Sequence, residues 1–190
     1  MKRNKEILIL VAAYVLLLLV MFILPVYSTP ESSIICNTLS QLGAQYTPNA
    51  WIMNFTFASL GIGSIISGWR YFEGYEFQRL FLILFGISLT LAAFFNHAPV
   101  NPLIQYKISE DGWHSYFIFT TTLTFIILTV SSTFMHEKET DKLLAMAAGM
   151  LVLFLSVLMS KATQTAGVWQ RLSFIISFGW IIYSFKTREL

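Results

Sequence analysis

Residues 7–27 read ILILVAAYVLLLLVMFILPVY, a run of 21 residues without a charged side chain. A helix needs about 20 apolar residues to cross the hydrocarbon core of a bilayer. Basic residues precede the run and Val26-Tyr27-Ser28 ends it, so a cleaved signal peptide is the alternative. The run is longer than the apolar part of a typical signal, however, and we therefore expect a transmembrane helix.

The remaining residues are also unusually apolar. Of the 190 residues, 56% are hydrophobic and 12% are charged, whereas about 25% are charged in soluble domains. This composition excludes a soluble globular protein and a disordered chain. The net charge of +2, without a basic cluster, gives no indication of a nucleic-acid partner. Cys36 is the single cysteine, so no disulfide can form within the chain.

The sequence predicts one all-α domain, residues 1–190, that forms an integral membrane bundle of six transmembrane helices. Open sheets are excluded because backbone polar groups in lipid must be paired internally. Membrane lipids are the expected partners. The six expected spans cover about residues 7–27, 50–70, 79–98, 113–135, 142–161 and 166–185.

The distribution of Lys and Arg predicts that both termini are cytoplasmic, because cytoplasmic loops carry an excess of these residues. The side opposite the termini holds only Lys107 and Lys161, with Arg171 near the start of the sixth span. The nine other cations fall on the side of the termini: Lys2, Arg3, Lys5, Arg70, Arg79, Lys138, Lys142, Lys186 and Arg188.

Polar residues gather on the predicted outer side. The first outer loop, residues 28–49, is long and carries one charge, so we expect it to fold back onto the bundle. Arg171 and His114 are ionisable residues within spans, which are candidate functional residues by default. Arg171 alternatively pairs with a loop carboxylate such as Glu110 or reaches the lipid headgroups, only to hold its helix.

Two kinds of reactive centre are conceivable on this side. His97, His114 and Asp111 together could supply three zinc ligands and leave a position for water, although their spacing matches no compact ligand motif. Ser40 could act as a nucleophile with His114 as its base, but no Gly-x-Ser-x-Gly sequence surrounds it. Ser40, His114 and Asp111 are thus weak catalytic candidates, and no cofactor is expected apart from a possible zinc ion.

Small residues indicate close helix packing. Ser59, Gly63 and Ser67 recur every fourth residue of the second span, a spacing that lets helix backbones approach. This stripe packs either within the bundle or between protomers of a homo-oligomer. The hydroxyls of the fourth span, including Thr121 and Thr129, can bond to carbonyls one turn back and need not line a pore.

Several outer-side motifs resemble a known family. Leu39-Ser-Gln-Leu-Gly43 precedes a helix with Asn54-Phe55, His114 opens the fourth span, and Gly167-Val-Trp-Gln-Arg171 opens the sixth, with Trp180 farther along. In this order they are similar to the motifs of an uncharacterised six-span membrane family, domain of unknown function 998. That family is in turn distantly similar to eukaryotic DRAM/Sfk-type membrane proteins.

The resemblance covers nearly the whole chain. It implies that Ser40, Gly43, Asn54, His114 and Arg171 match family positions, and the family's microbial character implies a bacterial or archaeal cytoplasmic (inner) membrane. The family's frequent Phe-Pro-x-Asp after the third span is Phe95-Asn-His-Ala-Pro99 here, so no acidic role carries over to that position.

These observations favour a non-enzymatic protein with an outward-facing pocket for a lipid headgroup or small amphiphile. Lys161, Gln170 and Arg171 would hold a phosphate or carboxylate. The alternative is a metal-dependent intramembrane lipid hydrolase, and a further alternative is a small transporter, against which the lack of mid-bilayer charge counts. The expected ligand-binding residues are Ser40, Asn54, His114, Gln170 and Arg171.

Overall fold

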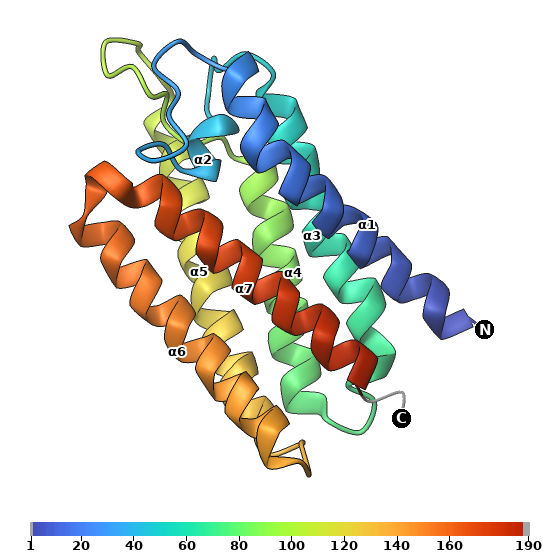
Figure 1. Cartoon of the computed structure of the whole chain (residues 1–190). Coiled ribbons are helices and arrows are strands. Elements are labelled where there is room, and N and C mark those ends of the chain that lie inside the picture. Colours follow the sequence, from blue (N-terminus) through green and yellow to red (C-terminus); the bar gives the residue numbers. More distant parts are fainter. Residues whose placement is uncertain (1, 188–190) are drawn as a thin grey trace.

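The computed structural model of the chain is a bundle of long helices joined by loops (Figure 1). It describes the backbone of residues 2–187 and the side chains of residues 6–186. Arg188 and the side chains of Lys2, Arg3 and Lys5, all used for the predicted orientation, lie outside the described residues. Residues 2–187 contain no strand. The elements are α1 (Lys2–Ile23), the 3-10 helix η1 (Leu24–Tyr27), α2 (Leu39–Leu42), α3 (Ala50–Tyr71), α4 (Glu76–Phe94), α5 (Ile108–Ser132), α6 (Glu139–Lys161), the 3-10 helix η2 (Thr163–Thr165) and α7 (Ala166–Thr187).

Five helical segments within the described residues are long and apolar enough to cross a membrane, which indicates an integral membrane protein. They are Glu6–Tyr27, Ala50–Tyr71, Glu76–Phe94, Ile108–Ser132 and Glu139–Lys161. The sixth predicted span corresponds to α7, which has 22 residues but is not among these five. Its sequence includes Gln170, Arg171 and several serines, and within residues 166–186 only Leu172, Tyr183 and Lys186 are exposed. Most of the polar residues of α7 are therefore enclosed by protein.

On either side of the loop between α4 and α5, two of the predicted span boundaries differ from the ends of the helices by four residues or more. The third predicted span extends to residue 98, but α4 ends at Phe94 because Phe95 has extended backbone angles. The fourth predicted span begins at residue 113, but α5 already begins at Ile108. Glu110 and Asp111 lie in the first turn of α5, where negative side chains are stabilised by the positive end of the helix dipole. His114 consequently lies more than one turn inside the helix.

The long helices pack in chain order around a ring, and α7 closes the ring against α1 (Figure 1). The Tyr14 hydroxyl on α1 donates to the Ile175 carbonyl on α7 over 3.1 Å. Aromatic side chains fill the interior: the Phe57 and Phe174 rings are stacked at 5.3 Å, and the Phe85 and Phe178 centroids lie 5.7 Å apart. The ring therefore encloses a packed core.

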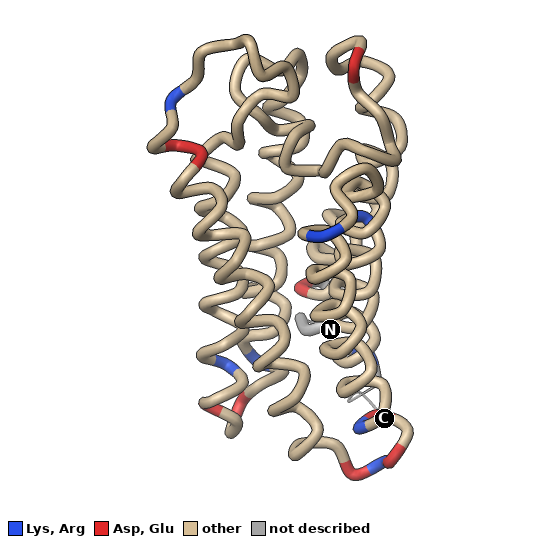
Figure 2. The backbone as a smooth tube through the Cα atoms, turned by 90° about the vertical axis from the view of Figure 1, so that its left-hand side faces the viewer, with Lys and Arg blue, Asp and Glu red and all other residues tan. Residues whose placement is uncertain are grey.

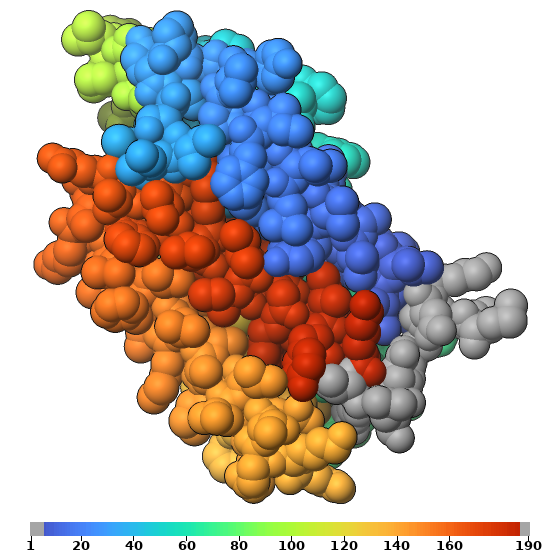
Figure 3. Space-filling model, viewed as in Figure 1, coloured from blue at the N-terminus to red at the C-terminus, as the bar shows by residue number. Residues whose placement is uncertain are grey.

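Loop 28–49 folds back onto the bundle, which confirms the prediction. It carries the short helix α2, in which Leu39 and Leu42 are almost fully buried. Figure 3 shows this loop lying directly against the start of α7. Figure 2 shows that the acidic and basic residues occupy loops and regions near helix ends.

Candidate functional site

A groove of about 490 Å³ lies between α5 and α6, in the half of the bundle near α2. In the other half the two helices are in close contact, since a Cβ atom on Gly149 would lie 2.3 Å from Thr129 Oγ1. One turn from this contact the groove begins, between Ile126 and Leu153. It is lined by Thr38, Ser40, His97, His114, Ser115, Ile118, Phe119, Thr122, Leu123, Ile126, Leu153, Ser156, Val157, Met159, Ser160 and Gln170.

The groove is apolar along its length and polar at one end. Phe119 and Val157 line its sides and are 66% and 50% exposed, so it opens laterally on the outer surface of the bundle. The hydroxyls of Thr122 and Ser156 are bonded to carbonyls one turn back in their own helices, as the sequence predicts for the hydroxyls of α5. The remaining polar groups lie toward α2.

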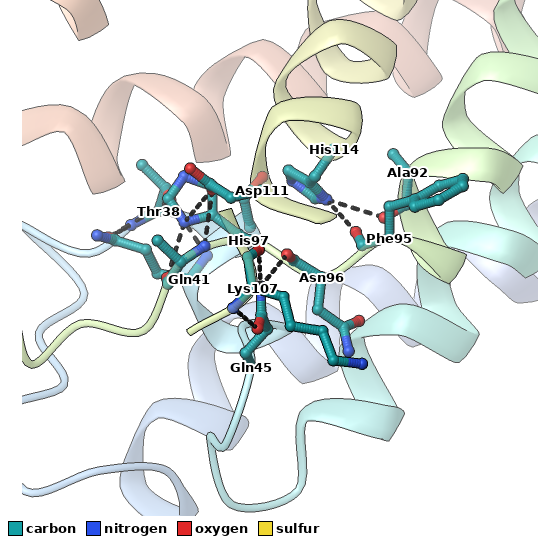
Figure 4. Close-up of polar contacts among 12 residues, drawn as sticks. Thr38, Gln41, Gln45, Ala92, Phe95, Asn96, His97, Lys107, Asp111 and His114 are labelled. Atoms are coloured by element: carbon teal, nitrogen blue, oxygen red, sulfur yellow. Dashed lines mark hydrogen bonds and ion pairs between the residues drawn. The ribbon is translucent and has the colours of Figure 1, made fainter. Parts of the chain in front are cut away.

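His114 is the most buried ionisable side chain that lines the groove, with 2% exposure. Its Nδ1 lies 2.9 Å from the Ala92 carbonyl oxygen and 2.7 Å from that of Phe95, at the end of α4 (Figure 4). Since both partners are acceptors, Nδ1 must carry the proton. Nε2 lies on the opposite side of the ring and has no hydrogen-bond partner among the described residues. This nitrogen is a buried acceptor without a donor.

His97 and Asp111 lie next to His114 but are held by the loop that follows α4. The His97 and His114 ring centroids are 5.4 Å apart. His97 Nδ1 lies 2.9 Å from the Ala98 carbonyl oxygen and 3.7 Å from Asp111 Oδ1, and Asp111 Oδ1 accepts the Ala98 N–H. The described part of the chain contains no group of three or more His, Cys, Asp or Glu residues arranged to hold a metal ion.

Ser40 and Gln170 form the side of the polar end that belongs to α2 and α7. Gln170 Oε1 accepts the backbone N–H groups of Leu39 and Ser40, the first two residues of α2, and its Nε2 donates to Ser40 Oγ over 3.3 Å. Ser40 Oγ makes no hydrogen bond to His114 Nε2. The candidate nucleophile Ser40 and its candidate base His114 thus line the same groove without a hydrogen bond between them.

Arg171 does not line the groove. It is 3% exposed, and its Nη1 donates to the carbonyl oxygens of Ile34, Asn37 and Gly167 while Nε donates to that of Met21. Arg171 does not pair with a loop carboxylate among the described residues, and its side chain does not reach an exposed surface. Both of these structural roles were alternatives expected from its position in the sequence. The guanidinium instead fixes loop 28–49 to the start of α7.

Lys161 and Glu110 do not line the groove either. Lys161 is exposed at the end of α6. Glu110 accepts a hydrogen bond from Lys107 Nζ at 2.9 Å, and this bond raises the pKa of Lys107. Among the described residues no Lys, Arg, Asp or Glu lines the groove, and the ionisable side chains that do line it are His97 and His114.

Asn54 does not line the groove and connects two loops at the end of the bundle that carries α2. Its Nδ2 donates to the Gly43 carbonyl and to Asn96 Oδ1. Gln45, which the sequence analysis missed, continues this connection: its Nε2 donates to the carbonyls of Asn96 and Lys107, and its Oε1 accepts the Lys107 N–H (Figure 4). The available signal in the sequence was its position two residues after the Leu39–Gly43 motif.

The Ser59, Gly63 and Ser67 stripe is used within the chain. A Cβ atom on Gly63 would lie 3.4 Å from Leu10 Cα, and Ser67 Oγ donates to the Glu6 carbonyl over 2.7 Å. The stripe therefore packs α3 against α1.

The comparisons with known proteins agree with the motifs on the outer side. No curated protein and no solved structure matches the chain significantly. The sequence model of one family, described as "Protein of unknown function (DUF998)", matches residues 11–185. This match includes the Leu39–Gly43 and Gly167–Arg171 motifs, whose contacts hold loop 28–49 on the bundle, as well as His114. The chain belongs to the DUF998 family.

Proposed function

We propose that this protein is a six-span membrane protein whose groove between α5 and α6 binds one amphiphile from the outer leaflet. The headgroup lies near His114, Ser40 and Gln170, and the hydrocarbon chain follows α5. In this proposal α7 is the sixth span, both termini are cytoplasmic, and α2 with the long loops faces outward.

The observation that carries the proposal is the distribution of side chains in the groove. Amphiphile sites combine a long apolar surface with a few polar groups that orient the headgroup. Leu123, Ile126 and Leu153 supply the apolar surface. The hydroxyls of Thr122 and Ser156 are bonded within their own helices, and the other polar groups of the groove lie toward the end near α2. Lateral exposure of Phe119 and Val157 would allow a lipid to enter from the bilayer without crossing water.

The length of the groove also supports a ligand from one leaflet. On α5 it extends from His114 to Ile126, which corresponds to about 18 Å at a rise of 1.5 Å per residue. The hydrocarbon core is about 30 Å thick, so one leaflet contributes about half of that. An acyl chain in this groove would therefore end close to the bilayer midplane, where Thr129 and Gly149 bring the two helices together.

A pair of tryptophan substitutions tests the proposal. Val157 lines the groove and is 50% exposed, whereas Val15 on α1 is 49% exposed and lies outside it. Native mass spectrometry of the purified protein would measure uptake of two probes, 1-oleoylglycerol and oleate. We expect the wild type and Val15→Trp to bind at least one probe, and Val157→Trp to lose most of that binding. Equal binding by both variants, or no binding by the wild type, would refute the proposal.

A metal-dependent hydrolase is the second candidate, and one observation favours it. His114 donates from Nδ1 to backbone carbonyls and leaves Nε2 free, which is the usual arrangement of a metal-binding histidine. Elemental analysis after zinc supplementation tests this role. Near-stoichiometric zinc that is lost in the His97→Ala/His114→Ala double variant would support it, and absence of zinc from the supplemented wild type would count against it.

A further inference from the structure

We infer that the groove selects an uncharged amphiphile with a hydroxyl headgroup, whose O–H donates to His114 Nε2. The inference rests on the proposed function and specifies the chemical class of its ligand. It differs from the expectation derived from the sequence, in which Arg171 and Lys161 hold a phosphate or carboxylate.

The hydrogen bonds of His114 determine what its free nitrogen requires. Nδ1 faces two carbonyl oxygens and therefore keeps its proton, so in the neutral ring Nε2 is an acceptor. A buried acceptor without a partner is costly, and no described side chain supplies a donor. A ligand O–H satisfies Nε2, whereas an ester, ether or carboxylate oxygen does not.

Ser40 supplies the complementary group. Its Oγ accepts a hydrogen bond from Gln170 Nε2, and its own O–H donates to no acceptor among the described residues. A hydroxyl both donates and accepts, so the ligand hydroxyl that donates to His114 can accept a bond from Ser40. Both residues line the polar end of the groove.

The lack of a counter-charge argues against an anionic headgroup. Among the described residues no Lys or Arg lines the groove. The Arg171 guanidinium donates to four carbonyl oxygens through Nε and Nη1, and its Nη2 is buried without a partner among the described residues and does not line the groove. Burial of an anion without a cation is strongly unfavourable. The charge distribution thus selects a neutral headgroup at the same place where His114 requires a donor.

Three probes with the same oleoyl chain separate these properties in the wild-type protein. 1-Oleoylglycerol is neutral and has hydroxyls, methyl oleate has no donor, and 1-oleoylglycerol 3-phosphate adds a negative charge. We expect native mass spectrometry titrations to show binding of 1-oleoylglycerol about tenfold tighter than that of each other probe, the size of one buried hydrogen bond. Equal or tighter binding of methyl oleate or of the phosphate would overturn the inference but leave amphiphile binding intact.

His114→Asn identifies the atom responsible. The asparagine amide nitrogen can replace Nδ1 as donor to Ala92 and Phe95, while nothing replaces Nε2. We expect this variant to stay folded and to lose the preference for 1-oleoylglycerol over methyl oleate, whereas His136→Asn, at the opposite end of the bundle, retains it. A folded His114→Asn protein with the full preference would overturn the inference. If it does not fold, the comparison of probes in the wild type still decides. Failure of all three probes and of oleate to bind would instead refute the proposed function.

Discussion

Gln170 accepts a hydrogen bond from the backbone N–H of Leu39, a residue 131 positions earlier in the chain, at 2.5 Å. The first N–H groups of a helix have no partner within the helix. This bond supplies a partner for one of them at the start of α2. Four residues are too few for a stable isolated helix. The position of Ser40 at the groove therefore depends on α7, which holds α2 from outside.

Gly167→Ala should destabilise this connection. A Cβ atom on Gly167 would lie 2.4 Å from the Asn37 carbonyl oxygen and 2.6 Å from that of Ile34, and backbone atoms cannot rotate away. We expect a loss of about 1–3 kcal/mol of unfolding free energy, measured by denaturant titration in mixed micelles. Gly112→Ala is the control, because nothing lies within 4 Å of its Cβ position, and it should raise stability by up to about 1 kcal/mol. Equal stabilities of the two variants would contradict this account.

Arg171→Lys should be destabilising although it conserves the charge. A lysine ammonium cannot reproduce the planar fork with which Arg171 contacts Met21, Ile34 and Asn37. We expect a loss of about 1–3 kcal/mol in the same titration, since buried acceptors are left unpaired. Arg70 is exposed and its Nη1 lies 3.6 Å from the half-buried Glu6, so Arg70→Lys should change stability by less than about 0.5 kcal/mol. Once folded, Arg171→Lys should bind 1-oleoylglycerol normally, and selective loss of binding would instead indicate a ligand contact.

The sequence alone predicts which segments are apolar helices, because each of the first five long helices contains a run of at least 15 residues without a charged side chain. It also predicts that loop 28–49 covers the bundle, since Leu39 and Leu42 cannot remain in water. These inferences require only the hydropathy of consecutive residues. For α3 the predicted end, residue 70, is one residue short of the observed end at Tyr71.

The direction of polar side chains could not be predicted in this way. Arg171 was expected to bind an anion, but its Nη1 donates to the carbonyl oxygens of Ile34 and Asn37, which loop 28–49 brings to α7 from far away in the sequence. The groove exists because α5 and α6 separate beyond Gly149. The sequence around Thr122 and Ser156 does not indicate this separation. Tertiary contacts, rather than the periodicity of the sequence, determine the direction of the Arg171 side chain and the position of the groove.

Gly43 and Asn54 should be energetically coupled. A Cβ atom on Gly43 would lie 2.2 Å from Asn54 Oδ1, while Asn54 Nδ2 donates to the Gly43 carbonyl. Gly43→Ala should therefore cost about 1–3 kcal/mol in the wild-type background. With Asn54→Ala the obstructing carboxamide is absent, so the double variant should be more stable than additivity predicts by about 0.5–3 kcal/mol. A complete double-mutant cycle checks this, and additivity within about 0.5 kcal/mol would exclude the close contact.

Cys36 offers a direct test of the proposed orientation. It is the only cysteine of the chain and is exposed in loop 28–49, the loop that the excess of cations on the opposite side places outside the cytoplasm. A membrane-impermeant maleimide added to intact spheroplasts should therefore label the wild-type protein without permeabilisation. The Cys36→Ser variant is the background control, and Cys36→Ser/Glu73→Cys, which moves the thiol to the loop between α3 and α4, should be labelled only after permeabilisation. If the two thiols show the reverse pattern, the groove opens to the inner leaflet, and the amphiphile proposed here would have to come from the cytoplasmic side.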